Sequence, residues 1–79
     1  MDKKKQIEFL NQILEQKIKE FLNNEINYMA LQGMIMATGR SQDVLAAETK
    51  AKMAKDLLER QIRNCKKVIE LVKDNKLEL

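Results

Sequence analysis

A chain of 79 residues with a formal net charge of +3 makes one small domain, in which a single core leaves stability marginal. Its residues are 44% hydrophobic and 34% charged, with no Pro and two Gly. This composition suits a helical protein and argues against disorder and against all-β folds. The sequence therefore predicts an all-α fold that needs further burial from a partner or a second copy.

The first expected element is a helix over about residues 3–37. Apolar residues recur there every three or four positions, which places them on one stripe of a helix and not on alternate faces of a strand. The stripe consists of Ile7, Leu10, Leu14, Ile18, Phe21, Tyr28 and Ile35. The apolar run over residues 29–37 is about half of the roughly 20 residues that a membrane-spanning helix needs, so no membrane segment is expected.

The stretch Thr38-Gly39-Arg40-Ser41 is expected to be a turn over residues 38–41. Gly39 can take the left-handed conformation that closes a helix, and Ser41 can accept a hydrogen bond from the first amides of the next helix. Asp43 complements the dipole of that helix. So short a connection between two long helices favours antiparallel neighbours, an αα-hairpin over residues 1–79.

The second expected helix covers about residues 41–74 and carries a heptad seam interrupted by Gln61. The seam consists of Val44, Ala47, Ala51, Ala54, Leu58, Cys65, Val68 and Val72. Folding the chain at Gly39 places residues whose numbers sum to about 79 opposite each other, as with Leu14 and Cys65. Asn24 and Gln61 fall where apolar residues are expected; buried amides there would fix the register, whereas seam-edge amides would be solvated.

The first helix has more apolar surface than one neighbouring helix can cover. Phe9 and Ile13 project to one side of its stripe, and Leu22 and Ile26 project to the other. The apolar run contributes Met29, Met34 and Met36. We therefore expect these seven residues to form an oligomer or partner interface, most simply in a four-helix bundle or larger homo-oligomer. The alternative is that they are exposed singly, as is common on protein surfaces.

Catalytic chemistry is not expected. The chain has no His and no Gly-rich phosphate loop, and its one Cys, Cys65, falls on the seam, where a buried thiol acts as a small hydrophobe. We therefore predict no enzyme, no catalytic residue, no metal site and no cofactor. One Cys cannot form an internal disulfide, and the basic start MDKKKQIEF lacks the apolar core of a signal peptide, so a cytoplasmic location is expected.

Two groups of residues are candidates for binding anions. Thr38, Gly39, Arg40 and Ser41 combine an Arg and two hydroxyls with a helix N-terminus, which could hold a phosphate. A basic stripe on the second helix consists of Lys52, Arg60, Arg63, Lys66 and Lys67. The alternatives are an ordinary turn and a solvated helix face, because Asp56, Glu59 and Glu70 border the stripe.

The pattern helix, Gly turn and helix, with AxGRSQDVL across the turn, resembles the small helical-hairpin phosphatases of sporulation aspartyl-phosphates. Those proteins carry a Ser-Gln-x-Leu-Asp signature in the second helix. The corresponding stretch here reads AAETKAKMAKDLL, which lacks the signature, so the resemblance transfers no residue and no activity. Small phage-encoded helical proteins that bind host factors or sequester nucleotide signals share only this size and shape.

Three functions follow from the sequence. The leading prediction is a non-enzymatic helical oligomer that acts as a regulator or inhibitor by docking on a protein partner. The first alternative is an oligomer that captures an anionic small molecule, such as a nucleotide or cyclic nucleotide, through Arg40 and Ser41. The second is a nucleic-acid-binding accessory protein that uses the basic stripe.

Overall fold

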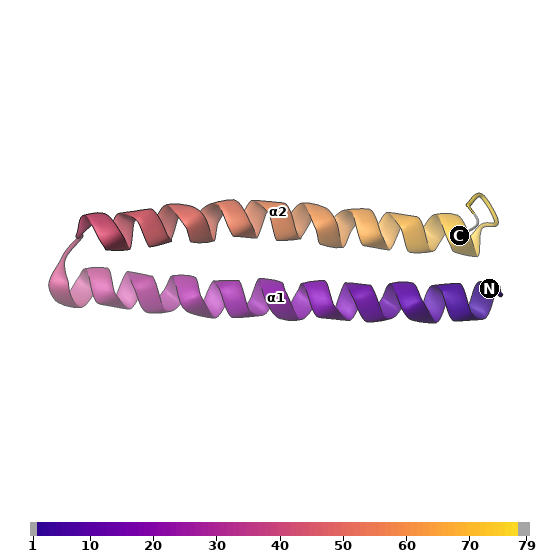
Figure 1. Ribbon diagram of the computed structural model, residues 1–79, viewed down its shortest axis with the longest axis horizontal. Coiled ribbons are helices and arrows are strands. Elements are labelled where there is room, and N and C mark those ends of the chain that lie inside the picture. Colours follow the sequence, from indigo (N-terminus) through magenta and orange to yellow (C-terminus); the bar gives the residue numbers. More distant parts are fainter. Residues whose placement is uncertain (1, 78–79) are drawn as a thin grey trace.

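The computed structural model describes residues 2–77, and within them the chain is a hairpin of two helices with no strand. Helix α1 spans Lys3–Thr38 and helix α2 spans Gln42–Lys73. The two helices lie side by side and run antiparallel, with both ends of the chain at the same end of the rod (Figure 1). The rod measures 54 × 15 × 14 Å. The prediction of an all-α hairpin is confirmed; its assembly into a bundle stays a prediction.

Gly39 and Ser41 have the roles in the turn that the sequence predicted. The Gly39 N–H donates to the Ile35 carbonyl at 2.9 Å, and Gly39 has φ 80° and ψ −178°, a region that side chains disfavour. The Ser41 Oγ accepts from the Val44 N–H at 3.2 Å and caps α2. At the other end, the Asp2 carboxylate accepts from the Lys5 N–H at 2.8 Å and caps α1.

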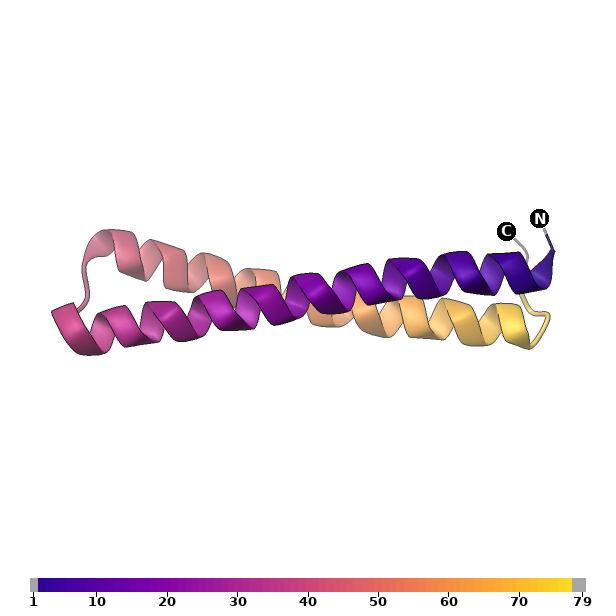
Figure 2. The same cartoon turned by 90° about the horizontal axis from the view of Figure 1, so that it is seen from below.

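The apolar core lies at the end of the rod opposite the turn. Leu10, Ile69 and Val72 are buried against one another. Half-buried side chains pack around them, namely those of Ile7, Leu14, Cys65 and Val68. Leu14 and Cys65, which were expected to face each other, therefore occur in one cluster. The two helices cross over each other along the rod (Figure 2). Cys65 is half-buried here and its Sγ lies 3.5 Å from the Leu10 carbonyl oxygen.

The half of the rod beside the turn is held together differently. Its buried apolar side chains are Leu31, Val44 and Ala51, and α2 offers little volume there because the stretch is rich in Ala. Shallow hollows lie on both sides of Ala51 as a result. Polar contacts between the helices supplement the small apolar core in this half.

Neither helix, within residues 2–77, contains a stretch long and apolar enough to cross a membrane. The apolar run of α1 that suggested such a segment is too short, and it is interrupted by Gln32 and Gly33.

The two glycines provide a matched test of this backbone. Replacing Gly39 with Ala should lower the free energy of unfolding by about 1–3 kcal/mol, because its φ and ψ suit only glycine. Replacing Gly33 with Ala should raise that free energy by about 0.5–1 kcal/mol, since Gly33 lies inside a helix and an added Cβ would meet no atom within 4 Å. Urea unfolding of dilute protein, followed by circular dichroism, measures both changes. Two changes of the same sign would contradict the conformation described for the turn.

Candidate functional site

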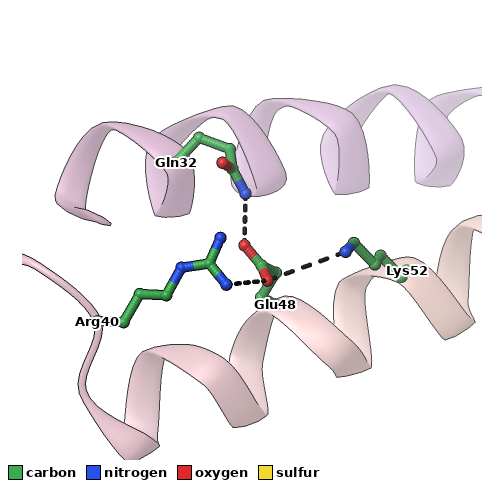
Figure 3. Close-up of polar contacts among 4 residues, drawn as sticks. All are labelled: Gln32, Arg40, Glu48 and Lys52. Atoms are coloured by element: carbon green, nitrogen blue, oxygen red, sulfur yellow. Dashed lines mark hydrogen bonds and ion pairs between the residues drawn. The ribbon is translucent and has the colours of Figure 1, made fainter. Parts of the chain in front are cut away.

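A buried carboxylate lies between the two helices near the turn. Glu48 is on the face of α2 that points toward α1, and only 6% of its surface is exposed. The Gln32 Nε2, from α1, donates to the Glu48 Oε2 at 2.6 Å (Figure 3). A carboxylate taken out of water is costly unless hydrogen bonds and opposite charges compensate it. This hydrogen bond therefore links α1 to α2. Separating the two helices would remove the Gln32 donor from the Glu48 carboxylate.

Two cations approach the other oxygen of the same carboxylate. The Arg40 Nη1, from the turn, lies 3.8 Å from the Glu48 Oε1, and the Lys52 Nζ lies 3.9 Å from it (Figure 3). Both cationic side chains are more than half exposed, so solvent weakens these ion pairs. We name Gln32, Arg40, Glu48 and Lys52 the Glu48 cluster; it links α1, the turn and α2 through one carboxylate.

Two further polar contacts cross between the helices in the same half of the rod. The Asn24 Nδ2 donates to the Ala51 carbonyl at 2.9 Å, and the Lys55 Nζ lies 3.8 Å from the Glu25 Oε1. Asn24 was one of the two polar residues on the expected seam, and its amide bonds directly across the helix interface. Gln61, the other one, is half-buried.

The residues of the predicted anion site are engaged within the chain. The Thr38 Oγ1 donates to the Met34 carbonyl at 2.8 Å, and the Ser41 Oγ accepts from the Val44 N–H. Arg40 faces Glu48, so an anion at Arg40 would compete with a carboxylate that is already in place. Anion binding by this turn stays a prediction, and these contacts give it no added support.

The structure separates one member of the basic stripe from the others. Lys52 approaches Glu48, whereas Arg60, Arg63, Lys66 and Lys67 are exposed along the half of α2 away from the turn. Binding of nucleic acid by these residues stays a prediction.

Sequence reasoning missed the Glu48 cluster. From the sequence alone, Glu48 would be taken as a solvated charge at the edge of the seam, because it follows the seam residue Ala47. Gln32 would be taken as an interruption of an apolar run. A usable signal was the spacing from Val44 to Glu48 to Ala51, which places a carboxylate between two seam residues. Gln6 was missed in the same way, and it is buried near the start of α1.

All seven residues of the predicted apolar interface are exposed in the hairpin. They are Phe9, Ile13, Leu22, Ile26, Met29, Met34 and Met36. Five of them lie in the half of α1 beside the turn, which is the half where Glu48 is buried. In that half Glu48 is buried together with Leu31, Val44 and Ala51, while five large apolar side chains are exposed.

Comparison with known protein families, with characterised proteins and with solved structures finds no match to this chain. The function therefore has to be inferred from the surface and the contacts of the hairpin itself.

The energetic role of the Glu48 cluster can be measured with a double-mutant cycle. Removing Gln32 and Glu48 side chains singly and together, as Ala variants, should give a coupling free energy of about 1–2 kcal/mol, because the hydrogen bond is short and its acceptor is buried and charged. The half-buried pair Lys17 and Glu20, 3.5 Å apart on one helix and much more accessible to solvent than Glu48, is the control and should couple by less than about 0.5 kcal/mol. Equal coupling in the two cycles would contradict the role assigned to Glu48.

Proposed function

We propose that this chain is a non-enzymatic binding protein, a helical hairpin that self-associates and docks on a protein partner as a regulator or inhibitor. The main support is the uneven distribution of exposed apolar side chains between the two helices. Within residues 2–77, eight large apolar residues of α1 are exposed, against three of α2. Single exposed apolar residues are ordinary, but a concentration on one helix marks an interaction surface.

The exposed apolar residues of α1 form two separate regions. Phe9 and Ile13 lie one helical turn apart in the half that contains the apolar core. Of the six others, Ile18 lies near the middle of the helix and five lie in the half beside the turn. Helical spacing places Leu22, Ile26 and Met29 on the opposite side of the seam from Phe9 and Ile13, whereas Met34 lies on the side of Phe9. Two regions on different sides of one helix suit two different contacts.

We assign protein docking to the region of Phe9 and Ile13. Residues at positions i and i+4 of a helix are the usual anchors when a helix lies in an apolar groove of another protein. Aromatic side chains are also enriched among the residues that dominate binding energy. Phe9 is half exposed, so its ring has surface to lose on binding.

The two alternatives from the sequence have less support. Capture of a nucleotide would use Arg40 and Ser41, which already bind within the chain. Binding of nucleic acid would use the basic stripe, but one of its members, Lys52, lies near Glu48 within the hairpin.

Replacing Phe9 with Gln should weaken partner binding by about tenfold or more, because the main apolar anchor is lost. The measurement is capture of proteins from a lysate of the source cell on the immobilised hairpin, with quantification by mass spectrometry, followed by calorimetry with the purified partner. The matched control is Leu57→Gln, which removes a similarly exposed apolar side chain from α2. If every captured protein binds the two variants equally well, docking through Phe9 is wrong.

A further inference from the structure

The methionines of the described part of the chain lie on its surface and not in its core. Met29, Met34, Met36 and Met53 are all exposed, and no buried side chain there is a methionine. Methionine is usually found in protein interiors, where its flexible side chain fills irregular gaps. The hollows beside Ala51 are such gaps, and no methionine lines them. Core packing therefore does not account for these residues.

Helix formation does not account for the methionines either. Methionine and leucine have similar helix propensities and bury similar apolar surface, so leucine would serve equally well at each position. Two properties distinguish methionine, namely a flexible side chain and a sulfur atom that oxidises. The one thiol of the chain, Cys65, is half-buried beside the Leu10 carbonyl. The most exposed sulfur-bearing side chains of the described residues are therefore methionines.

Two of the methionines form a pair on one side of α1. Met29 and Met36 are seven residues, or about two helical turns, apart and lie on the same side of the helix as Leu22 and Ile26. Met29 is 71% exposed and Met36 87%. Residues 26–38 contain no charged residue, so a polar group introduced at the pair changes the character of this side of the helix.

We propose that Met29 and Met36 are a modification site, at which oxidation by hydrogen peroxide switches off self-association of the hairpin. The proposal rests on the proposed function, in which the hairpin self-associates. At each methionine the thioether sulfur attacks one oxygen of the peroxide, so an S–O bond forms and the O–O bond breaks. The departing hydroxide takes the proton from the new S–OH group and leaves as water. The sulfur is thereby oxidised to the sulfoxide, and the peroxide is reduced.

The sulfoxide changes the surface of the hairpin and leaves its fold in place. The new oxygen accepts hydrogen bonds, which water supplies on a separate hairpin and an apolar contact surface does not. The pair takes no part in the core around Leu10, Ile69 and Val72, so the added oxygen displaces no core contact. Oxidation therefore weakens association without unfolding the chain. Because sulfoxide reductases regenerate methionine, the change is reversible.

Oxidation and self-association compete for the same two side chains. In the separate hairpin both side chains are exposed, so peroxide reaches them, whereas association through this side of α1 covers them. Oxidised hairpins do not associate again, so the reaction draws the population toward separate hairpins by mass action.

The test compares two double variants that lose the same number of sulfur atoms. Met29→Leu with Met36→Leu removes the pair, and Met34→Leu with Met53→Leu is the matched control, since both of its positions are exposed elsewhere. Each protein is oxidised when dilute, freed of peroxide, concentrated and measured by light scattering. Oxidation should lower the association constant of the unaltered chain and of the control about tenfold or more. It should leave that of the pair variant unchanged.

Three further measurements isolate the effect of the pair. Mass spectrometry counts the sulfoxides, and circular dichroism checks that the oxidised hairpins stay helical. Cys65 is present in all three proteins, so an effect of its oxidation would appear in all of them. Met29→Gln with Met36→Gln places polar groups at the pair without peroxide, and it should associate about tenfold more weakly than the unaltered chain.

Each outcome supports or overturns the proposal. Loss of association confined to proteins that retain the pair, with the helices intact and with recovery after reductase treatment, supports it. Equal loss in all three proteins, or full association of the oxidised unaltered chain or of the Gln variant, overturns the switch and leaves self-association in place. Loss of helix on oxidation also overturns the switch. A monomer at every concentration overturns self-association and the switch together, while docking through Phe9 is decided by the capture experiment alone.

Discussion

Each helix of a two-helix hairpin has one neighbour, so the chain can bury only one stripe of each helix by itself. Burial of apolar surface contributes about 25 cal/mol per Å², and a small domain has little of it to spare. In this protein the apolar stripe between the helices is closely packed at one end, around Leu10 and Val72, and is packed incompletely beside the turn. The apolar residues that α1 has in excess then face solvent.

The two halves of the rod differ in what holds them. Away from the turn, branched apolar side chains from both helices pack against one another. Beside the turn, α2 offers alanines, and the contacts between helices include the hydrogen bonds of Gln32 with Glu48 and of Asn24 with Ala51. Polar contacts between helices stabilise less than apolar packing but are strict in geometry, so they fix how the helices are aligned. The cross-helix pairs Asn24 with Ala51 and Gln32 with Glu48 have numbers that sum to 75 and 80, close to the expected 79.

This arrangement determines which side chains of α1 are exposed. A hairpin aligned by polar contacts on the inside keeps Leu22, Ile26 and Met29 on the outside, where a further helix can cover them. Phe9 and Ile13 lie on another side of the same helix and are exposed as well. In the proposed function, one helix serves both self-association and docking on a protein partner.

Local signals made most of the fold predictable. The helices follow from the spacing of apolar residues, and the turn follows from Gly39 and Ser41, whose roles depend only on their own backbone and the next few amides. The seam predicted facing residues such as Leu14 and Cys65, which pack in the apolar core away from the turn. Asn24 was recognised because an amide on a seam is unusual, and its bond to Ala51 crosses the interface as such an amide should.

The Glu48 cluster was not predictable in this way. Whether Glu48 is solvated or buried depends on how far α1 covers that side of α2, which is a property of the packed pair. The same holds for Arg40. From the sequence alone it is a candidate ligand-binding residue, whereas in the structure its guanidinium lies 3.8 Å from the Glu48 carboxylate.

Methionine oxidation tests the central claim, that the turn half of α1 is covered by another copy, on the unaltered protein. In the hairpin Met29, Met36 and Met53 are all exposed, so hydrogen peroxide should convert them to sulfoxides at similar rates in dilute protein. As concentration rises, Met29 and Met36, on the exposed side of α1, should become protected by about tenfold while Met53 on α2 should not. Mass spectrometry of the peptides gives each rate separately. Equal rates for the three residues at every concentration would contradict coverage of α1 by a second copy.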